Sequence, residues 1–269
     1  MSAVNAYLQR VANGALMSQQ EKAGIETSIA TLDKRLFEEF DNAIVSKRLI
    51  FGSYARQTML PRWMDEQSDV DYMVVFADSN KEPQTYLDRL KRFAERRYSN
   101  STRYQDHPTI ALDLNHIRFE LVPAKDATIW TGLQIPAKGA IFKWMETTPD
   151  AFSKDLDAKD RRCNGLIRPL VRLAKYWNAR SGYVFESYGL EQKIVAHNFL
   201  WVPETLEAYF FSFMDTLNVS WDASQKSKDK IASLKQALQT VRRHLNSQHD
   251  LVAAMNMARL LPAKETVAP

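Results

Sequence analysis

Two aspartates separated by one residue, Asp69 and Asp71, open an apolar stretch that ends at Phe76. Apolar and polar residues alternate at its start, which predicts a β-strand, on which residues two apart point to the same face. Neighbouring carboxylates repel each other unless a cation lies between them, and Mg²⁺ takes oxygen ligands while sharing its coordination with substrate phosphates. The pair therefore predicts a metal site for phosphate chemistry; the alternative is a strand that begins with two solvent-exposed aspartates.

A Gly-Ser turn, Gly52 and Ser53, lies upstream of the aspartates in the same 49–76 stretch. Glycine lets the backbone approach a ligand closely, and backbone N–H groups and a serine hydroxyl bind phosphate oxygens near the start of a helix. The Gly-Lys-Ser/Thr ending of a Walker loop does not follow, so the turn is not a P-loop. The turn and the aspartates together predict a site that holds both a metal and a phosphate.

A metal site of this kind takes a third carboxylate from a neighbouring strand, and Asp113 and Glu120 are the two candidates. The segments 109–114 and 116–122 both alternate in polarity and are joined by a short polar turn, which predicts a hairpin. Each candidate lies on the polar face of its own strand. The residues by themselves leave both candidates open.

A basic flank on a predicted helix supplies candidate phosphate ligands. Arg168, Arg172 and Lys175 follow one another at steps of four and three residues, beside the apolar stripe of this helix. Residues at those steps share one face of a helix. The flank is either a solvated basic edge or a phosphate-binding surface, and Lys175 is the candidate for the second role.

The elements that must position these residues can be predicted from the hydrophobic pattern, which gives an α+β fold. We expect helices at 3–20, 24–47, 53–60 and 83–98, and strands at 48–51, 69–76, 109–114 and 116–122. Residues 125–149 are mixed, because glycines and prolines break any long element. Beyond them helices dominate, at 150–181, 188–200, 203–217, 224–247 and 249–262.

This pattern divides the chain into three parts without a flexible linker. N-terminal helices over 1–48 pack on a core at 49–149, which carries the turn and the carboxylates, and 150–269 form a C-terminal helical domain.

The composition excludes several classes of protein. The chain has 269 residues and a single cysteine, Cys163, so neither a disulfide framework nor a cysteine zinc site is expected. No run of about 18 apolar residues is present, so no membrane span is expected, and the N-terminus lacks the pattern of a secretory signal. We expect a cytoplasmic protein. The net charge of +4 suits a polyanionic substrate but is common among proteins without one.

Several motifs, taken in order, carry a resemblance to a known family. Gly-Ser-Tyr-Ala-Arg-Gln-Thr at 52–58 and Ser-Asp-Val-Asp-Tyr-Met-Val-Val-Phe at 68–76 resemble the signature of the DNA polymerase β-type nucleotidyltransferases. Phe-Glu-Leu-Val-Pro-Ala at 119–124 resembles the third-carboxylate strand of the oligoadenylate synthetase and cGAS-like branch, which includes the bacterial cGAS/DncV-like nucleotidyltransferases (CD-NTases). The segments 170–178 and 186–191 resemble the core helix and the Ser-Tyr-x-Leu-Glu element of the same group. The match runs from about residue 25 to near residue 261.

The resemblance implies a polymerase β-like core with a mixed sheet, followed by a C-terminal helical bundle. It implies that Asp69, Asp71 and Glu120 hold two Mg²⁺ ions, with Mn²⁺ as the alternative metal. It also implies phosphate binding, by Gly52, Ser53, Lys175 and Ser187, and stacking of Tyr188 near the base. By its place before Val-Pro-Ala, the resemblance selects Glu120 over Asp113 as the third carboxylate, and the chain departs here from the family, which usually has an aspartate at this position.

The function that the resemblance implies is the joining of nucleoside triphosphates into a cyclic or short linear oligonucleotide signal, with release of pyrophosphate, in antiviral defence. Two alternatives share the same site: transfer to an RNA 3′ end or a protein acceptor, and a catalytically inactive nucleotide-binding homologue. The sequence does not determine the base preference, the linkage, the product length, an activating protein or nucleic acid, or the oligomeric state.

Overall fold

The computed structural model describes residues 2–99, 101–106, 108–127, 132–137 and 143–264. The chain divides into two compact units. The first, here called the helical unit, comprises Met1–Met17, Leu60–Glu66 and Asp155–Pro269, and the second, the sheet unit, comprises Ser18–Met59 and Gln67–Lys154. The helix at the N-terminus therefore belongs with the C-terminal helices, whereas the sequence grouped residues 1–48 together. The segment 60–66, between the Gly-Ser turn and the aspartates, also belongs to the helical unit.

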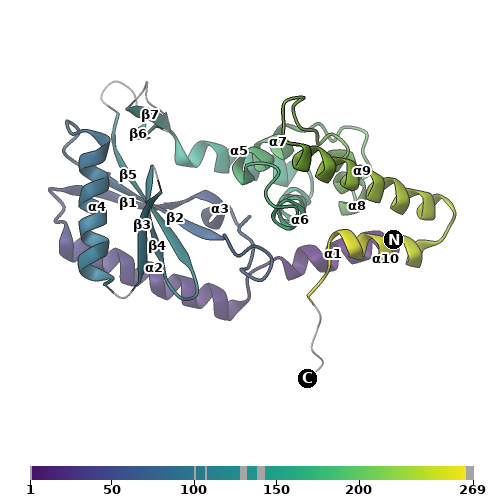
Figure 1. The fold of residues 1–269 in the computed structure, drawn as a ribbon, viewed down its shortest axis with the longest axis horizontal. Coiled ribbons are helices and arrows are strands. Elements are labelled where there is room, and N and C mark those ends of the chain that lie inside the picture. The colour runs from purple at the N-terminus through teal and green to yellow at the C-terminus, as the bar shows by residue number, and fades with distance from the viewer. Residues whose placement is uncertain (1, 100, 107, 128–131, 138–142, 265–269) are drawn as a thin grey trace. The chain divides into compact units, whose positions relative to one another are not determined.

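The sheet unit is built on a mixed sheet, as predicted (Figure 1). Its strands are β1 (Val45–Phe51), β2 (Asp69–Phe76), β3 (Thr102–Asp106), β4 (Thr109–Asp113), β5 (Arg118–Asp126), β6 (Leu133–Pro136) and β7 (Trp144–Thr147). The order across the sheet is β1-β2-β5-β4-β3, with β6 pairing with both β5 and β7. The β2/β5 pair is parallel and the remaining pairs are antiparallel. The predicted hairpin is β4/β5; β3, β6 and β7 were not predicted as strands. Parts of the 125–149 segment, at 128–131 and 138–142, lie outside the described residues.

Helices α2 (Gln19–Glu39) and α4 (Pro83–Arg97) lie along the sheet (Figure 1). Asp33 of α2 accepts hydrogen bonds from Arg48 of β1, at 2.9 Å, and from the Tyr72 hydroxyl of β2, at 2.6 Å. Phe40, which ends α2, packs on Phe76 of β2. Tyr72 and Phe76 alternate with Asp69 and Asp71, so α2 covers the face of β2 opposite to the aspartates.

The helix predicted over 24–47 ends at Glu39, so its last residues were assigned wrongly. The Asp41 carboxylate accepts hydrogen bonds from the backbone N–H groups of Ala43 and Ile44, at 2.9 and 3.0 Å, and this turns the chain. Ile44 then accepts a hydrogen bond from Ala77, and β1 begins at Val45. The apolar spacing continued through the turn and concealed the helix end from the sequence.

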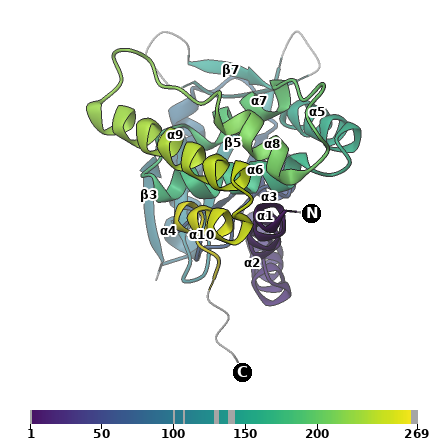
Figure 2. The same ribbon diagram turned by 90° about the vertical axis from the view of Figure 1, so that its right-hand side faces the viewer.

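The helical unit packs around one core. Its helices are α1 (Ala3–Gly14), α6 (Ile167–Arg180), α7 (Ser187–Ala196), α8 (Leu206–Met214), α9 (Gln225–Asn246) and α10 (Asp250–Leu260), and α5 (Pro149–Arg162) carries the chain from one unit into the other. Figure 2 shows α10 beside both α1 and α9.

The single helix predicted over 150–181 is two helices, α5 and α6. Asn164 and Gly165 have φ of 51° and 76° and break the helix between them. The Asp160 carboxylate then accepts hydrogen bonds from the backbone N–H groups of Ile167 and Arg168, at 2.9 and 3.0 Å, and so caps the start of α6. Among the described residues, no helix combines the length and the apolar character that a membrane crossing requires.

Candidate active site

The Gly-Ser turn joins β1 to a single helical turn, α3 (Gly52–Ala55), which packs on β2. The Ser53 carbonyl accepts hydrogen bonds from the backbone N–H groups of Thr58 and Met59, at 2.9 and 3.1 Å. The predicted helix over 53–60 therefore stops after one turn, and Gln57 has a φ of 61°. These bonds fix the loop in which Gly52 and Ser53 lie.

Gly52 lies directly against the second aspartate. Phe51 pairs with Asp71 across β1 and β2, and a Cβ placed on Gly52 would lie 1.7 Å from Asp71 Oδ2 and 2.5 Å from its Cγ. Gly52 also has a φ of +70°, which residues with a side chain rarely adopt. Both the backbone conformation and the contact with the carboxylate therefore require glycine at this position.

The three predicted carboxylates lie on two adjacent parallel strands. Asp71 of β2 is in register with Glu120 of β5, and Asp69 is in register with Arg118. Asp69, Asp71 and Glu120 are each partly exposed, whereas their neighbours Val70 and Phe119 are fully buried. We call these three residues the carboxylate cluster.

The electrostatics of the cluster show that Glu120 lies among negative charges. The pKa of Glu120 is raised from 4.5 to about 7, chiefly by burial and further by the negative charges of Asp69 and Asp106. A hydrogen bond with Asp69 favours the protonated form further, and the positive charge of Arg118 opposes the rise. Glu120 is therefore held as a carboxyl group that ionises near neutral pH.

Asp113, the competing candidate, has a different partner. Its Oδ1 accepts a hydrogen bond from Arg118 Nε at 2.7 Å across the β4/β5 pair. The guanidinium compensates the charge of Asp113, whereas Glu120 shares its surroundings with Asp69. Asp113 is therefore paired within the β4/β5 hairpin, whereas Glu120 belongs to the carboxylate cluster.

The donor set of the cluster fits a hard divalent cation. Its side-chain donors are carboxylate oxygens, which Mg²⁺ and Mn²⁺ prefer, and a cation would relieve the repulsion that raises the pKa of Glu120. Within the part of the chain that the structure describes, no three His, Cys, Asp or Glu side chains are already arranged around a common point. The carboxylates would therefore have to reorient around a bound ion.

The remaining predicted residues belong to the helical unit. Lys175 of α6 is buried, with 5% of its side chain exposed, and its Nζ lies 3.3 Å from Oε1 of Glu191 in α7, which is 1% exposed. A buried ammonium group needs such a partner, because an uncompensated charge in the interior is costly. The sequence predicts no role for Glu191, although this residue ends the Ser-Tyr-Gly-Leu-Glu segment at 187–191.

The basic flank of α6 is not a solvated edge. Arg172 is 6% exposed, and burial lowers its pKa to about 10, with Asp160 opposing the change. Arg168 forms ion pairs with Asp157 and Asp160. Each cation of the flank is thus buried, or partly buried beside carboxylates of its own unit.

Ser187 and Tyr188 occupy the first turn of α7. The backbone N–H groups at a helix N-terminus and the helix dipole favour a bound anion. Tyr188 is 45% exposed, so its ring is accessible at this helix start. Each unit therefore holds its own group of the predicted residues: Gly52, Ser53 and the carboxylate cluster in the sheet unit, and Lys175, Ser187 and Tyr188 in the helical unit.

Comparisons with known proteins point to one family. Residues 1–160 match the family described as Second Messenger Oligonucleotide or Dinucleotide Synthetase domain. The solved structure of CdnC from E. coli MS115-1 with ATP is similar, with a TM-score of 0.70 and 14% identity over 95% of this chain and 97% of that one. No match was found among curated proteins.

Two further structures share the fold. The CD-NTase CdnG from Bradyrhizobium diazoefficiens, in complex with GTP, has a TM-score of 0.69 and 14% identity over 96% of this chain and 98% of that one. The cyclic AMP-GMP synthase DncV from Vibrio cholerae, in complex with the linear intermediate 5′ pppA(3′,5′)pG, has a TM-score of 0.65 and 11% identity over 98% and 88%. At these identities the likeness concerns the fold.

Proposed function

Because the chain belongs to the Second Messenger Oligonucleotide or Dinucleotide Synthetase domain family and is a nucleotidyltransferase, we propose that it joins nucleoside triphosphates into a cyclic or short linear oligonucleotide in a Mg²⁺-dependent reaction. The observation that carries this proposal is the carboxylate cluster, with Asp71 in register with Glu120 and in contact with Gly52. Structurally similar proteins were solved with ATP, with GTP and with a linear dinucleotide intermediate, which supports nucleoside triphosphates as the substrates.

In the proposed reaction a ribose hydroxyl oxygen forms a bond to the α-phosphorus of a nucleoside triphosphate. The bond from that phosphorus to its bridging oxygen breaks, and pyrophosphate leaves. The proton of the hydroxyl passes to the carboxylate of Glu120, which lies beside Asp69 in the cluster. When bound by Asp69, Asp71 and Glu120, Mg²⁺ supplies positive charge that favours ionisation of the attacking hydroxyl and stabilises the leaving oxygen.

The other assigned residues bind and orient the substrate. The turn at Gly52 and Ser53 offers backbone N–H groups and a hydroxyl to phosphate oxygens, and the absence of a side chain on Gly52 leaves room for the Asp71 carboxylate. Lys175 supplies positive charge for the triphosphate, and Ser187 donates a hydrogen bond to it from the start of α7. The Tyr188 ring stacks on the base.

Incubation with all four labelled nucleoside triphosphates and Mg²⁺, without any acceptor, tests the proposal. We expect short products whose formation releases pyrophosphate and stops when a chelator removes the metal. Product resistance to phosphatase separates a cyclic from a linear oligonucleotide, and replacement of Mg²⁺ by Mn²⁺ tests the alternative metal.

Variants of the carboxylates provide the controls. Asp69→Ala with Asp71→Ala is expected to abolish turnover, and Glu120→Gln to reduce it by at least about 10²-fold, the loss expected for a missing proton acceptor. Asp113→Asn is the matched control, and it should retain most of the activity because Asp113 is paired with Arg118. Equal losses in Asp113→Asn and Glu120→Gln would contradict the assignment of Glu120.

The two alternatives predict other outcomes of the same assay. Products that form only after an RNA or a protein acceptor is added would indicate transfer to a macromolecule. Triphosphate binding without turnover under every metal and acceptor condition would indicate an inactive homologue and would falsify the proposed synthesis.

The proposed setting is defence against phage, which follows from the family resemblance. Cells that carry the chain with its native neighbouring genes should survive phage challenge better than cells that carry the Asp69→Ala, Asp71→Ala variant. Equal survival of the two strains would argue against this setting while leaving the enzymatic proposal intact.

A further inference from the structure

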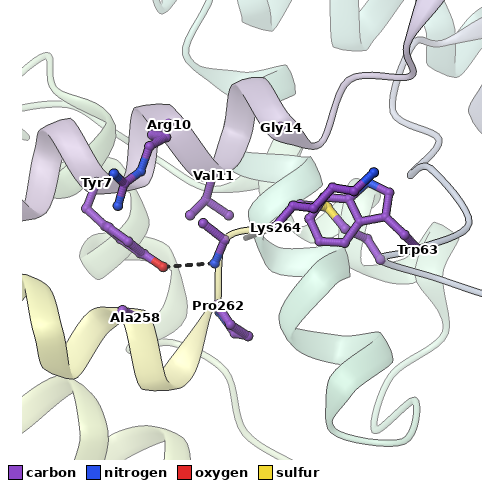
Figure 3. Close-up of a pocket in the computed structure, with 10 residues that line it drawn as sticks. Tyr7, Arg10, Val11, Gly14, Trp63, Ala258, Pro262 and Lys264 are labelled. Carbon is purple, nitrogen blue, oxygen red and sulfur yellow. Dashed lines mark hydrogen bonds between the residues drawn. The ribbon is translucent and has the colours of Figure 1, made fainter. Parts of the chain in front are cut away.

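A cavity of about 540 Å³ lies within the helical unit, apart in its residues from those assigned above (Figure 3). Its walls come from α1, from the 60–66 segment, and from the end of α10 with the chain that follows. The volume lies within the range of small-molecule sites. The residues that matter here are Tyr7, Arg10, Gly14, Trp63, Ala263 and Lys264.

One wall of this cavity is held rigidly by hydrogen bonds. The Tyr7 hydroxyl donates to the Leu261 carbonyl at 2.8 Å and accepts from the Ala263 N–H at 3.0 Å, the bond drawn in Figure 3. The Tyr176 hydroxyl of α6 donates to the Pro262 carbonyl at 2.9 Å. The chain after α10 is thus fastened to both α1 and α6, and the cavity is formed before any ligand binds.

The cavity combines positive charge with aromatic surface. The Arg10 guanidinium lies 4.9 Å from the centre of the Tyr7 ring, and the Lys264 ammonium lies 5.7 Å from the Trp63 ring. Within the described residues neither cation forms an ion pair, and no acidic side chain lines the cavity. The rings of Trp63 and Tyr176 pack in a T-shaped arrangement with their centres 6.0 Å apart. Even so, 37% of Trp63 is exposed.

We propose that this cavity is a second nucleotide-binding site, in which a base stacks on Trp63 beside Lys264 and a phosphate is bound by Arg10 at the other end of the cavity (Figure 3). A flat ring matches an exposed indole beside apolar walls, and a phosphate matches a guanidinium that lacks a carboxylate partner. The shared chemistry of the ligand is a nucleoside phosphate, supplied either by the free nucleotide pool or by the oligonucleotide product. The cavity lies beyond the proposed function, because none of its residues is assigned to catalysis.

Photo-crosslinking with 8-azido-AMP locates the ligand directly. AMP has no pyrophosphate to release, so it cannot serve as the donor in the proposed reaction. We expect labelled peptides that contain residues of 1–17, 60–66 or 258–264, in the absence of metal and also in the Asp69→Ala, Asp71→Ala variant. Labelling confined to peptides outside these three segments would overturn the proposal. Because crosslinking does not depend on turnover, its failure would contradict the second site without contradicting the proposed function.

Affinity measurements by equilibrium dialysis with AMP test the two cations and the ring. Trp63→Ala is expected to weaken binding about tenfold, as for the loss of one base–aromatic contact. Arg10→Ala with Lys264→Ala should weaken binding similarly and reduce its salt dependence. A linear diadenylate that binds tenfold more tightly than AMP would identify an oligonucleotide as the ligand, and equal binding would identify the free nucleotide.

Gly14 offers a matched pair of variants that leave the walls intact. A Cβ on Gly14, the last residue of α1, would meet no atom within 4 Å, so a side chain there enters open space. Gly14→Glu should weaken AMP binding by at least about fivefold through repulsion of the phosphate, whereas Gly14→Lys should preserve or strengthen it. Lys226→Gln, which lowers the charge by the same one unit on α9, should leave binding unchanged. Equal AMP affinity in Gly14→Glu and Gly14→Lys would contradict the proposal.

Discussion

The carboxylate cluster of the sheet unit and the basic flank of α6 in the helical unit each gather charges of one sign, but they compensate them differently. The carboxylates of the cluster are partly exposed, and the pKa of Glu120 rises to about 7, first because the group is largely buried and then because Asp69 and Asp106 are negative. On α6, Lys175 is almost fully buried against Glu191, and Arg168 is paired with Asp157 and Asp160.

This difference in charge compensation indicates which of the two regions, the carboxylate cluster or the basic flank, needs a ligand to balance its charge. The cluster can lower its repulsion by taking up a cation from solvent, which suits a metal site. The flank is already balanced by carboxylates of its own unit, so a triphosphate that binds Lys175 has to share it with Glu191. We therefore expect the cluster to respond to metal and pH, and the flank to respond to the loss of its internal partners.

Removing Lys175 should have the largest effect on stability. Lys175→Met leaves Glu191 buried without its ammonium partner, and loss of one member of a buried pair costs about 3–5 kcal/mol. We expect a corresponding fall in the free energy of unfolding in urea, together with loss of activity.

A double variant separates the two consequences. Lys175→Met with Glu191→Met should recover most of the stability, because the buried charge is removed, but should not recover activity. If Lys175→Met abolishes activity and leaves stability unchanged, then Glu191 does not stabilise the buried lysine. The flank would then not be charge-balanced from within its own unit, which contradicts the comparison with the cluster.

Gly52→Ala tests the close contact between Gly52 and the Asp71 carboxylate of the cluster. The added methyl group would displace the Asp71 carboxylate, and a displacement of about 1 Å in a catalytic site costs on the order of 10²-fold in rate. Turnover of labelled triphosphates is the measurement. Gly165→Ala is the matched control, since Gly165 has a φ of +76° but its Cβ would meet no atom within 4 Å. Both variants should lose stability, and only Gly52→Ala should lose activity; equal activity in the two would show that the contact with Asp71 is unimportant.

The pH dependence of stability tests the uncompensated charge of Glu120. Its pKa is about 7 in the folded protein and 4.5 ordinarily, so between these values the folded state keeps a proton that the unfolded state loses. The free energy of unfolding should therefore fall as the pH rises through this window, by about 1–2 kcal/mol after solvent screening is allowed for. Urea unfolding in the presence of a chelator, at about pH 4.5 and at about pH 8, measures it.

Glu120→Gln and Mg²⁺ supply the controls for this dependence. The glutamine variant should lose the fall in stability between the two pH values, and Mg²⁺ should stabilise the wild-type protein more at the higher pH. An unchanged pH dependence in Glu120→Gln would assign the titration to another group.

Tyr188→Ala should have the smallest effect. The ring is 45% exposed at the start of α7, and loss of one base–aromatic contact at the weak end of the range, about 1 kcal/mol, raises KM about fivefold. The rate at saturating triphosphate should stay within about twofold of the wild type, because stacking that is equal in the ground state and the transition state affects KM alone. Tyr188→Phe keeps the ring and should behave as the wild type; a raised KM in this variant would assign the effect to the hydroxyl group.

Several helices and strands could be predicted from the hydrophobic periodicity of their own residues. Strand β2 runs over Asp69–Phe76 as predicted, and α4 differs from its predicted range by one residue. The helix ends were predicted poorly, since Asp41 and the Asn164-Gly165 pair end helices through side-chain bonds and backbone conformations that hydrophobic spacing does not report. Strand β3 was missed because its residues are mostly exposed and lack an apolar face.

The sequence by itself determined the chemistry that this chain can offer: two aspartates on one strand face, a glycine turn before them, strands in the first half and helices in the second half. It did so because side-chain types and their spacing are local properties. Only the tertiary structure decided that Glu120 lies beside Asp69 while Asp113 is paired with Arg118, and that Lys175 is buried against Glu191. Those relations depend on strand register and helix packing, which bring together residues far apart in the chain.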